Sequence, residues 1–232
     1  MEMEVWLEWY GRILDDFGFS RKADEESASY LESFLREHGC PGPESLTVPS
    51  LDFIVFGAGP SLRKHVKRFK EVRGNITIVA ADGATTALLE EGLIPHIIVT
   101  DLDGRMEDII EANGRGASLV VHAHGNNLEA LRKYLPCLQN LIGTTQSIPY
   151  GCIYNFGGFT DGDRAVFLAE ALGAETVILA GMDFGEVVTR YSRPDMGSET
   201  GRADPVKRLK LEYAERLIEW IERNGRIQIE KW

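Results

Sequence analysis

From Leu51 onward, short apolar runs rich in β-branched residues alternate with stretches of helical periodicity. Within the runs apolar and polar residues do not strictly alternate, which is typical of strands buried on both faces of a parallel sheet. This pattern predicts an α/β fold, a doubly wound and mostly parallel sheet with helices on both faces. The expected strands are residues 53–56, 76–80, 96–99, 118–121, 140–143 and 176–180, with an edge strand over 226–230.

The first 45 residues have a different texture. Trp6, Trp9, Ile13 and Phe17 recur at helical spacing, so we predict an N-terminal helical segment over residues 1–45. Three prolines and two glycines among residues 39–50 indicate a linker or long turn before an α/β domain over 51–232. The aromatic residues of this segment are expected to lie in the core or in a subunit interface, which makes a homodimer an open expectation.

Composition excludes several classes of protein. The 232 residues carry a formal net charge of −11, whereas a general nucleic-acid binder would be basic. We expect no membrane span, because no apolar run is long enough, and no secretory signal, because the N-terminal residues are acidic and amphipathic. Three cysteines, Cys40, Cys137 and Cys152, are odd in number and form no CxxC pair. We therefore predict a reduced, cytoplasmic protein without disulfides.

A polar or glycine-rich cluster directly follows each expected strand. If the strands are parallel, these clusters share one rim of the sheet, where open α/β folds bind ligands. Such a concentration of aspartates exceeds what helix capping requires, so we predict a functional site at this rim. The clusters are GAGPS (57–61), ADGAT (81–85), TDLDG (100–104), HAHGNN (122–127), GTTQ (143–146) and GMDFG (181–185).

The GAGPS segment is typical of a turn that receives an anion. Gly57 and Gly59 allow close backbone approach, and Ser61 can cap the next helix. A dinucleotide fingerprint would place Gly or Ala where Leu62 stands, which argues against nicotinamide. Asp82 lies about where an acid would hold a ribose, so an adenosine-type ligand stays open, as does a turn without ligand.

Two D-x-D pairs are the candidate metal and catalytic residues. Asp101 and Asp103 follow a strand, and two hard carboxylates without a nearby thiolate suit Mg²⁺. The alternative is a turn in which they cap backbone amides. Asp161 and Asp163 stand at an expected helix start, where carboxylates also suit the helix dipole. Next to them, Arg164 could reach a phosphate.

Weaker candidates complete the rim. His122 and His124 have no evident third soft ligand for zinc, so phosphate contact or local hydrogen bonding is the preferred interpretation. Asp183 could contact a base, a pterin or a metal, or be only a turn acid. Lys207 and Lys210 form a basic spot near the start of the last helix, for which a solvated face is the alternative.

Together, the segments GAGPSL, ADGATTALLEEGLIPHIIVTDLDG, VHAHGNN, GGFTDGDRAVFLAEALGA and GMDFG resemble the archaeal 6-hydroxymethyl-7,8-dihydropterin pyrophosphokinase family, which is related in fold to thiamine pyrophosphokinase. The resemblance extends from about Phe53 to the last helix. Gly104 and Arg164 depart from the thiamine enzymes, which tend to have Ser and a nearby Lys in those stretches.

The resemblance implies transfer of a diphosphate from ATP to the hydroxymethyl group of a reduced pterin, with release of AMP and with Mg²⁺ as cofactor. It implies Mg²⁺ ligation by Asp101 and Asp103, with Asp161 or Asp163 completing the metal site or orienting the alcohol. The implied nucleotide or phosphate contacts are Gly57, Gly59, Ser61, Asp82, Gly83, Lys207 and Lys210, and the implied substrate contacts are His122, His124, Asn126, Asn155 and Asp183.

Three alternatives remain at this point. A thiamine pyrophosphokinase shares several of the same motifs, although GAGPS and HAHGNN favour the pterin family. A nucleotide- or S-adenosylmethionine-binding module would explain GAGPS and Asp82 but neither D-x-D pair. The last alternative is a non-catalytic family member joined to a helical interaction segment.

Overall fold

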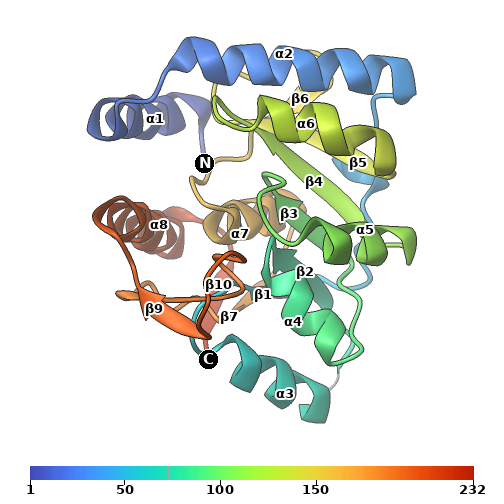
Figure 1. Cartoon of the computed structure of the whole chain (residues 1–232), viewed down its shortest axis with the longest axis vertical. Helices are drawn as coiled ribbons and strands as arrows, with labels where there is room; N and C mark the ends of the chain where they lie inside the picture. The colour runs from blue at the N-terminus through green and yellow to red at the C-terminus, as the bar shows by residue number, and fades with distance from the viewer. Residues whose placement is uncertain (73) are drawn as a thin grey trace.

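A computed structural model describes residues 1–72 and 74–232, and its centre is an eight-stranded sheet (Figure 1). In space the strands follow the order β10-β7-β1-β2-β3-β4-β5-β6, and each of these pairings is parallel. The prediction of an α/β fold with a parallel sheet and a C-terminal edge strand is confirmed. The strands are β1 (Asp52–Phe56), β2 (Thr77–Ala81), β3 (Ile97–Thr100), β4 (Ser118–Ala123), β5 (Leu141–Thr145), β6 (Ile153–Tyr154), β7 (Thr176–Ala180) and β10 (Gln228–Lys231).

Helices cover both faces of the sheet, as a doubly wound fold requires (Figure 1). Successive residues of a strand point to opposite faces. In β1, Ile54 and Phe56 therefore pack against one helical layer, whereas Phe53 and Val55 pack against the other. The first layer contains α2 (Arg21–His38), α3 (Leu62–Val72), α4 (Ala84–Glu90), α5 (Met106–Gly114) and α6 (Leu128–Tyr134), and the second contains α1 (Met3–Phe17), α7 (Asp161–Ala171) and α8 (Pro205–Asn224).

The strand order reverses beside β1. The chain builds β1 to β6 outward in one direction, and then α7 returns it to β7, which pairs with the other side of β1. At such a switch point the loops after the two central strands diverge and leave a crevice. The fold therefore places the tails of β1 and β7 at the position where a ligand would bind.

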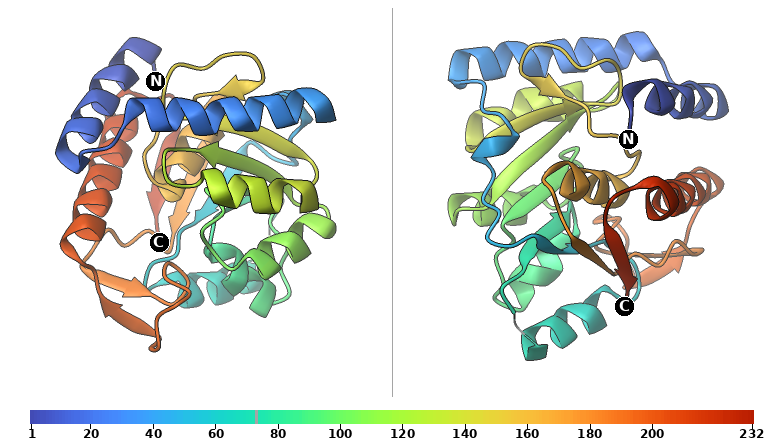
Figure 2. Two further views of the ribbon diagram at one scale, coloured as in Figure 1. Left: turned by 45° about the horizontal axis from the view of Figure 1, so that its top comes forward. Right: turned by 180° about the vertical axis from the view of Figure 1, so that it is seen from behind.

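The N-terminal helices are packed onto the α/β layers rather than set apart from them (Figure 2). Trp6, Tyr10 and Ile13 of α1 are fully buried against α7 and α8. Leu31 and Leu35 of α2 are buried over β4 and β5. Whether residues 1–45 form a separate folding unit stays a prediction. Among the described residues, the longest helices are too polar to cross a membrane.

The prediction of a protein without disulfides is wrong. Cys40, just after α2, and Cys152, just before β6, form a disulfide across 112 residues, with their Cα atoms 5.3 Å apart. Cys137 is exposed and free. Spacing arguments detect cysteines that are close in sequence, whereas this pair meets only because α2 lies along β5 and β6. Such a link typically stabilises a fold by about 2–4 kcal/mol.

A small hairpin that the sequence analysis did not predict projects from the end of β7. Its strands β8 (Val187–Thr189) and β9 (Thr200–Arg202) are antiparallel and three residues long. Strands this short carry too little periodicity to be recognised in the sequence. Thr189 donates its hydroxyl hydrogen to the carbonyl oxygen of Ala58 at 2.7 Å, so the hairpin is held over the loop that follows β1.

Candidate functional site

A cavity of about 470 Å³ opens at the carboxyl ends of the strands, at the switch point between β1 and β7. The tails of β1, β2, β3, β4 and β7 line it, together with the start of α7 and the first turns of α8. The loop between α1 and α2 and the β8–β9 hairpin form two further walls. The structure thus brings most of the predicted polar clusters together at one rim.

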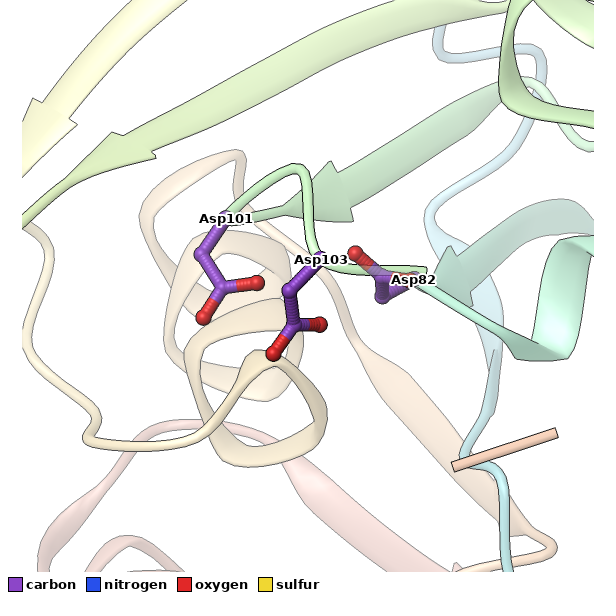
Figure 3. A group of neighbouring side chains, drawn as sticks. All are labelled: Asp82, Asp101 and Asp103. Atoms are coloured by element: carbon purple, nitrogen blue, oxygen red, sulfur yellow. The ribbon is translucent and has the colours of Figure 1, made fainter. Parts of the chain in front are cut away.

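Three carboxylates converge inside this cavity (Figure 3). Asp82 follows β2, whereas Asp101 and Asp103 follow β3, and one oxygen of each lies within 4.8 Å of the others. Leu102, between the last two, has a left-handed φ of 66° and is buried beneath them. This conformation lets both flanking aspartates reach the same space, although an extended segment would also have placed them on one side.

The loop around Asp82 is closely packed. The Thr100 hydroxyl donates a hydrogen bond to Asp82 Oδ2 at 2.5 Å. Gly104 passes so near that a Cβ atom there would lie 1.7 Å from Asp82 Oδ1. A serine at this position could not fit without moving Asp82. Glycine at position 104 therefore has a steric reason in this chain.

The three aspartates of this cluster differ in how readily they ionise. Burial and the charges of Asp101 and Asp103 raise the pKa of Asp82 well above its usual value. Asp103 reaches solvent, yet the pocket wall and the neighbouring Asp101 raise the pKa of Asp103 to about 7. Burial is the largest single influence on Asp101 and opposes its ionisation too. The bond to His124 Nε2, 3.1 Å away, the charge of His124, a bond with Asp103 and the charge of Arg164 together outweigh that cost and lower the pKa of Asp101.

The donor set fits a hard divalent cation. Asp101 Oδ1 is buried and has no hydrogen-bond partner among the described residues, so this oxygen lacks a compensating contact inside the protein. Carboxylate oxygens from Asp82, Asp101 and Asp103 are the ligands that Mg²⁺ prefers, with water and phosphate oxygens completing its shell. A cation held there would also relieve the mutual repulsion of the three carboxylates.

The two aspartates of the second D-x-D pair, Asp161 and Asp163, have different surroundings. Asp161 lines the cavity, and burial and the charge of Asp101 raise its pKa well above the usual value. Asp163 is fully buried outside the cavity lining. Its carboxylate accepts hydrogen bonds from the backbone amides of Phe159, at 2.6 Å, and Thr160, at 2.8 Å, as part of the capping box of α7. Asp163 therefore holds the helix start in place.

Cationic side chains line the same cavity as the acidic cluster. Arg164, from α7, is 8% exposed and lies 3.4 Å from Asp161. Lys207 and Lys210 reach the cavity from α8. Burial lowers the pKa of Lys210, although the charge of Asp101 partly offsets this effect. A cavity lined by both carboxylates and cations suits a phosphate chain that carries a metal ion.

The glycine turn after β1 reaches the cavity, but its amides are already paired. Gly57 N donates to Ala180 O and Gly59 N donates to Gly181 O, both at 2.8 Å. Ser61 lies outside the cavity lining, and its amide and hydroxyl both donate to Asp183 Oδ2, at 3.1 and 3.0 Å. These bonds join the tails of β1 and β7, and the predicted phosphate contacts of Gly57, Gly59 and Ser61 stay predictions.

The remaining predicted residues separate into two groups. Gly83, His124, Asn126 and Asp183 line the cavity. At Gly83 a Cβ atom would lie 1.7 Å from Tyr191 O, so glycine lets the hairpin segment approach.

His122 and Asn155 lie outside the cavity lining. His122 is 2% exposed, its Nδ1 is 3.1 Å from Thr144 Oγ1, and burial lowers its pKa well below the usual value. The Asn155 side chain is held by the Ser147 carbonyl oxygen at 2.7 Å and by the Gly157 amide at 2.9 Å.

Several residues that line the cavity were not among the predicted site residues. Asp24 of α2 and Gln146 after β5 line the cavity, as do Phe19, from the α1–α2 loop, and Tyr191. Gln146 belongs to the GTTQ cluster, a signal that could have singled it out. Asp24 carries no such signal, because a helix-start acid is ordinary.

Comparison with known proteins places this geometry in a family. A family model described as 6-hydroxymethylpterin diphosphokinase MptE-like matches residues 35–189. The chain is 75% identical, over the full length of both chains, to a Methanothermobacter thermautotrophicus protein named 6-hydroxymethyl-7,8-dihydropterin pyrophosphokinase.

Proteins of the same name from Methanocaldococcus jannaschii and Pyrococcus furiosus are each 42% identical to it. The match covers 99% of this chain in both cases, and 99% and 98% of the respective relatives. The chain therefore belongs to the 6-hydroxymethylpterin diphosphokinase MptE-like family.

Proposed function

We propose that this protein transfers a diphosphate from ATP to the hydroxymethyl group of 6-hydroxymethyl-7,8-dihydropterin and releases AMP. The observation that carries this proposal is the cavity at the switch point, where three converging carboxylates face Arg164 and two lysines. Full-length similarity to relatives that bear the pyrophosphokinase name supports the same reaction.

In this reaction the substrate hydroxyl oxygen forms a bond to the β-phosphorus of ATP, and the bond from that phosphorus to the α,β-bridging oxygen breaks. AMP leaves with the bridging oxygen, and the hydroxyl proton is released. Charge spreads over the transferred phosphoryl oxygens, so positioning and electrostatic stabilisation do most of the catalytic work. Mg²⁺, when bound, supplies charge neutralisation and holds the phosphate oxygens in place.

The aspartates in and beside the cavity would have different roles in this reaction. Asp82, Asp101 and Asp103 would hold Mg²⁺, because their carboxylate oxygens lie within 4.8 Å of one another. Asp161 is the better of its pair to orient the attacking hydroxyl or accept its proton, because its carboxylate faces the cavity and its pKa is raised. The Asp163 carboxylate is committed to the helix start.

Cationic and amide side chains would hold the two substrates. The guanidinium of Arg164 can bind phosphate oxygens in a bidentate way, and Lys207 and Lys210 can approach the triphosphate from α8. For the amide and amine edge of the pterin, Asn126 and Asp183 line the cavity. Asn155 is the weaker candidate, because its side-chain amide already bonds the backbone.

Product analysis tests the proposal directly. Purified protein with ATP, Mg²⁺ and hydroxymethyl-dihydropterin should yield AMP and the pterin diphosphate, and chelation of Mg²⁺ should stop the reaction. Formation of ADP, or no turnover, would contradict it. A parallel assay with thiamine separates the related pyrophosphokinase activity, and calorimetry with S-adenosylmethionine separates a simple binding module. AMP formation with thiamine alone would favour the thiamine alternative.

We also infer a cytoplasmic protein whose partners are these small molecules, because the proposed reaction consumes ATP. Nucleic acid is not an expected partner, because the net charge of the chain is strongly negative. A homodimer is the remaining proposal about assembly. Light scattering at several protein concentrations checks it, and a constant mass of one chain would contradict it.

A further inference from the structure

The geometry points to Asp24 as a positioning residue through which the N-terminal helices complete the active site, an inference that rests on the proposed function. Asp24 stands in the first turn of α2, is 2% exposed and lines the cavity. Its carboxylate organises two walls of the cavity, one that carries Arg164 and one that carries His124.

The first branch passes through Gln146. Gln146 Nε2 donates a hydrogen bond to Asp24 Oδ2 at 2.9 Å, which turns the amide oxygen Oε1 toward Arg164, 3.4 Å from its Nη2. The carboxylate thus sets which end of the amide faces the guanidinium. Trp6 of α1 also holds Gln146 in place. The Trp6 indole Nε1 donates a hydrogen bond to the backbone carbonyl oxygen of Gln146 at 2.8 Å.

The second branch passes through the turn after β4. Asp24 Oδ1 accepts a hydrogen bond from the backbone amide of Gly125 at 2.7 Å. Gly125 follows His124, whose Nε2 is 3.1 Å from Asp101 Oδ2. One buried carboxylate therefore holds the backbone that presents His124 to the acidic cluster. The Tyr10 hydroxyl donates the remaining bond, to Asp24 Oδ2 at 2.5 Å.

Arg164 needs such support. It is more than nine-tenths buried, its Nε has no hydrogen-bond partner among the described residues, and its contacts to Asp161 and Gln146 are both long, at 3.4 Å. A buried guanidinium with unused donors is poised for an anion, and bidentate binding of phosphate demands a fixed orientation. The Asp24–Gln146 pair supplies that orientation by joining α2 to the segment that follows β5.

Two substitutions test the first branch. In Asp24→Asn the side chain keeps its size, but its new amide group would face the Gln146 amide. Gln146 would then have to reverse and turn a donor toward Arg164, where two donors repel. Gln146→Leu removes the connection without touching Asp24, so it keeps the test valid if Asp24→Asn fails to fold.

Glu25→Gln is the matched control. Glu25 neighbours Asp24 on α2 and accepts a comparable bond from Ser147 Oγ at 3.1 Å, but it does not line the cavity. The readouts are calorimetric affinity for inorganic pyrophosphate with Mg²⁺, the steady-state kcat and KM for AMP formation, and the thermal midpoint. All affinities and rates are measured well below that midpoint.

We expect pyrophosphate affinity and kcat to fall about 10- to 100-fold in Asp24→Asn and Gln146→Leu, the cost of a lost hydrogen bond to a charged group, while Glu25→Gln stays within about 2-fold. The double variant should be no worse than Asp24→Asn, because both changes break one connection.

A purely structural Asp24 would lower the thermal midpoint and leave pyrophosphate affinity and kcat unchanged, which would overturn the inference. A second outcome would also overturn the positioning role of Asp24: the wild-type protein forms AMP, and both variants behave like Glu25→Gln. That outcome would leave the proposed reaction intact. Wild-type protein that forms no AMP, with pyrophosphate affinity reduced in both variants, would refute the reaction and support the positioning role.

Discussion

Two segments of this protein share the pattern D-x-D and end up with different roles. After β3, Asp101 and Asp103 both turn into the cavity beside Asp82. At the start of α7, Asp161 lines the cavity, but Asp163 turns away and caps the helix. The same two-residue spacing gives convergence in a loop and divergence in a helix.

The backbone explains the difference. In an α-helix each residue advances by about 100°, so side chains two positions apart point to nearly opposite sides. In the loop after β3, Leu102 adopts a left-handed conformation and is buried, which leaves both neighbouring carboxylates free to face the cavity. A repeated motif therefore indicates a shared function only when its backbone setting is also shared.

Replacing Asp101 should have the largest effect on the reaction. Asp101→Asn removes a proposed cation ligand, so we expect AMP formation to fall about 100- to 1000-fold. The free energy of unfolding should change little, because losing the contact with His124 that lowers the pKa of Asp101 is offset by relief of the repulsion that raises the pKa of Asp82 and Asp103. Product assays and urea unfolding measure the two quantities. An active Asp101→Asn protein would remove Asp101 from the metal site.

Replacing Asp163 should do the opposite. Asp163→Ala leaves the amides of Phe159 and Thr160 without their acceptor, so we expect a loss of about 2 kcal/mol in the free energy of unfolding. The folded protein should keep AMP formation within about 10-fold of wild type, since the lost contacts lie outside the chemistry. An unfolding curve that matches wild type, together with a loss of activity as large as for Asp101→Asn, would mean that Asp163 works in catalysis.

Asp161→Asn should separate the two halves of the second pair. We expect AMP formation to fall about 10- to 100-fold, the range for losing a positioned acid or base. Stability should not fall, because burial and Asp101 already disfavour the ionised form of Asp161. Rates and thermal midpoints of Asp161→Asn and Asp163→Ala, measured side by side, check this. Equal stability losses in both variants would contradict the assignment of different roles to Asp161 and Asp163.

The smallest expected effect is the change in protein stability with pH and Mg²⁺ that arises at Asp101 and Asp103, the pair after β3. The folded-state pKa of Asp103, about 7, lies above its ordinary value of about 4. The folded protein therefore holds a proton that the unfolded chain has released, and this stabilisation is lost as pH rises from about 4 through about 7. Mg²⁺ requires ionised carboxylates, so its stabilisation should grow over the same range.

Thermal midpoints at pH 5.5 and pH 8, with and without Mg²⁺, provide the measurement. Without Mg²⁺ the midpoint should be lower at pH 8, and the increase caused by Mg²⁺ should be larger there. Asp103→Asn should flatten both trends, whereas Asp52→Asn, at an exposed aspartate outside the cavity lining, serves as the control. A Mg²⁺ effect that is independent of pH would argue against Asp103 as a ligand.

Much of the site could be predicted from local sequence. The strand tails, and with them Asp82, Asp101, His124 and Asp183, were found because each follows a run with strand-like composition. The role of Asp163 could not be separated from that of Asp161, because both a ligand and a cap use a carboxylate at the same place in a helix. The hairpin with Tyr191 was missed because its strands are three residues long.

By itself, the sequence determined the parallel α/β arrangement, the positions of the main strands and the rim at which acids gather. These features depend on periodicity and turn residues within a few positions of each other. Only the tertiary structure decided that Asp24 reaches Gln146 across 122 residues and that Cys40 meets Cys152 across 112. Contacts over such separations depend on how helices pack against the sheet, and no local pattern encodes that packing.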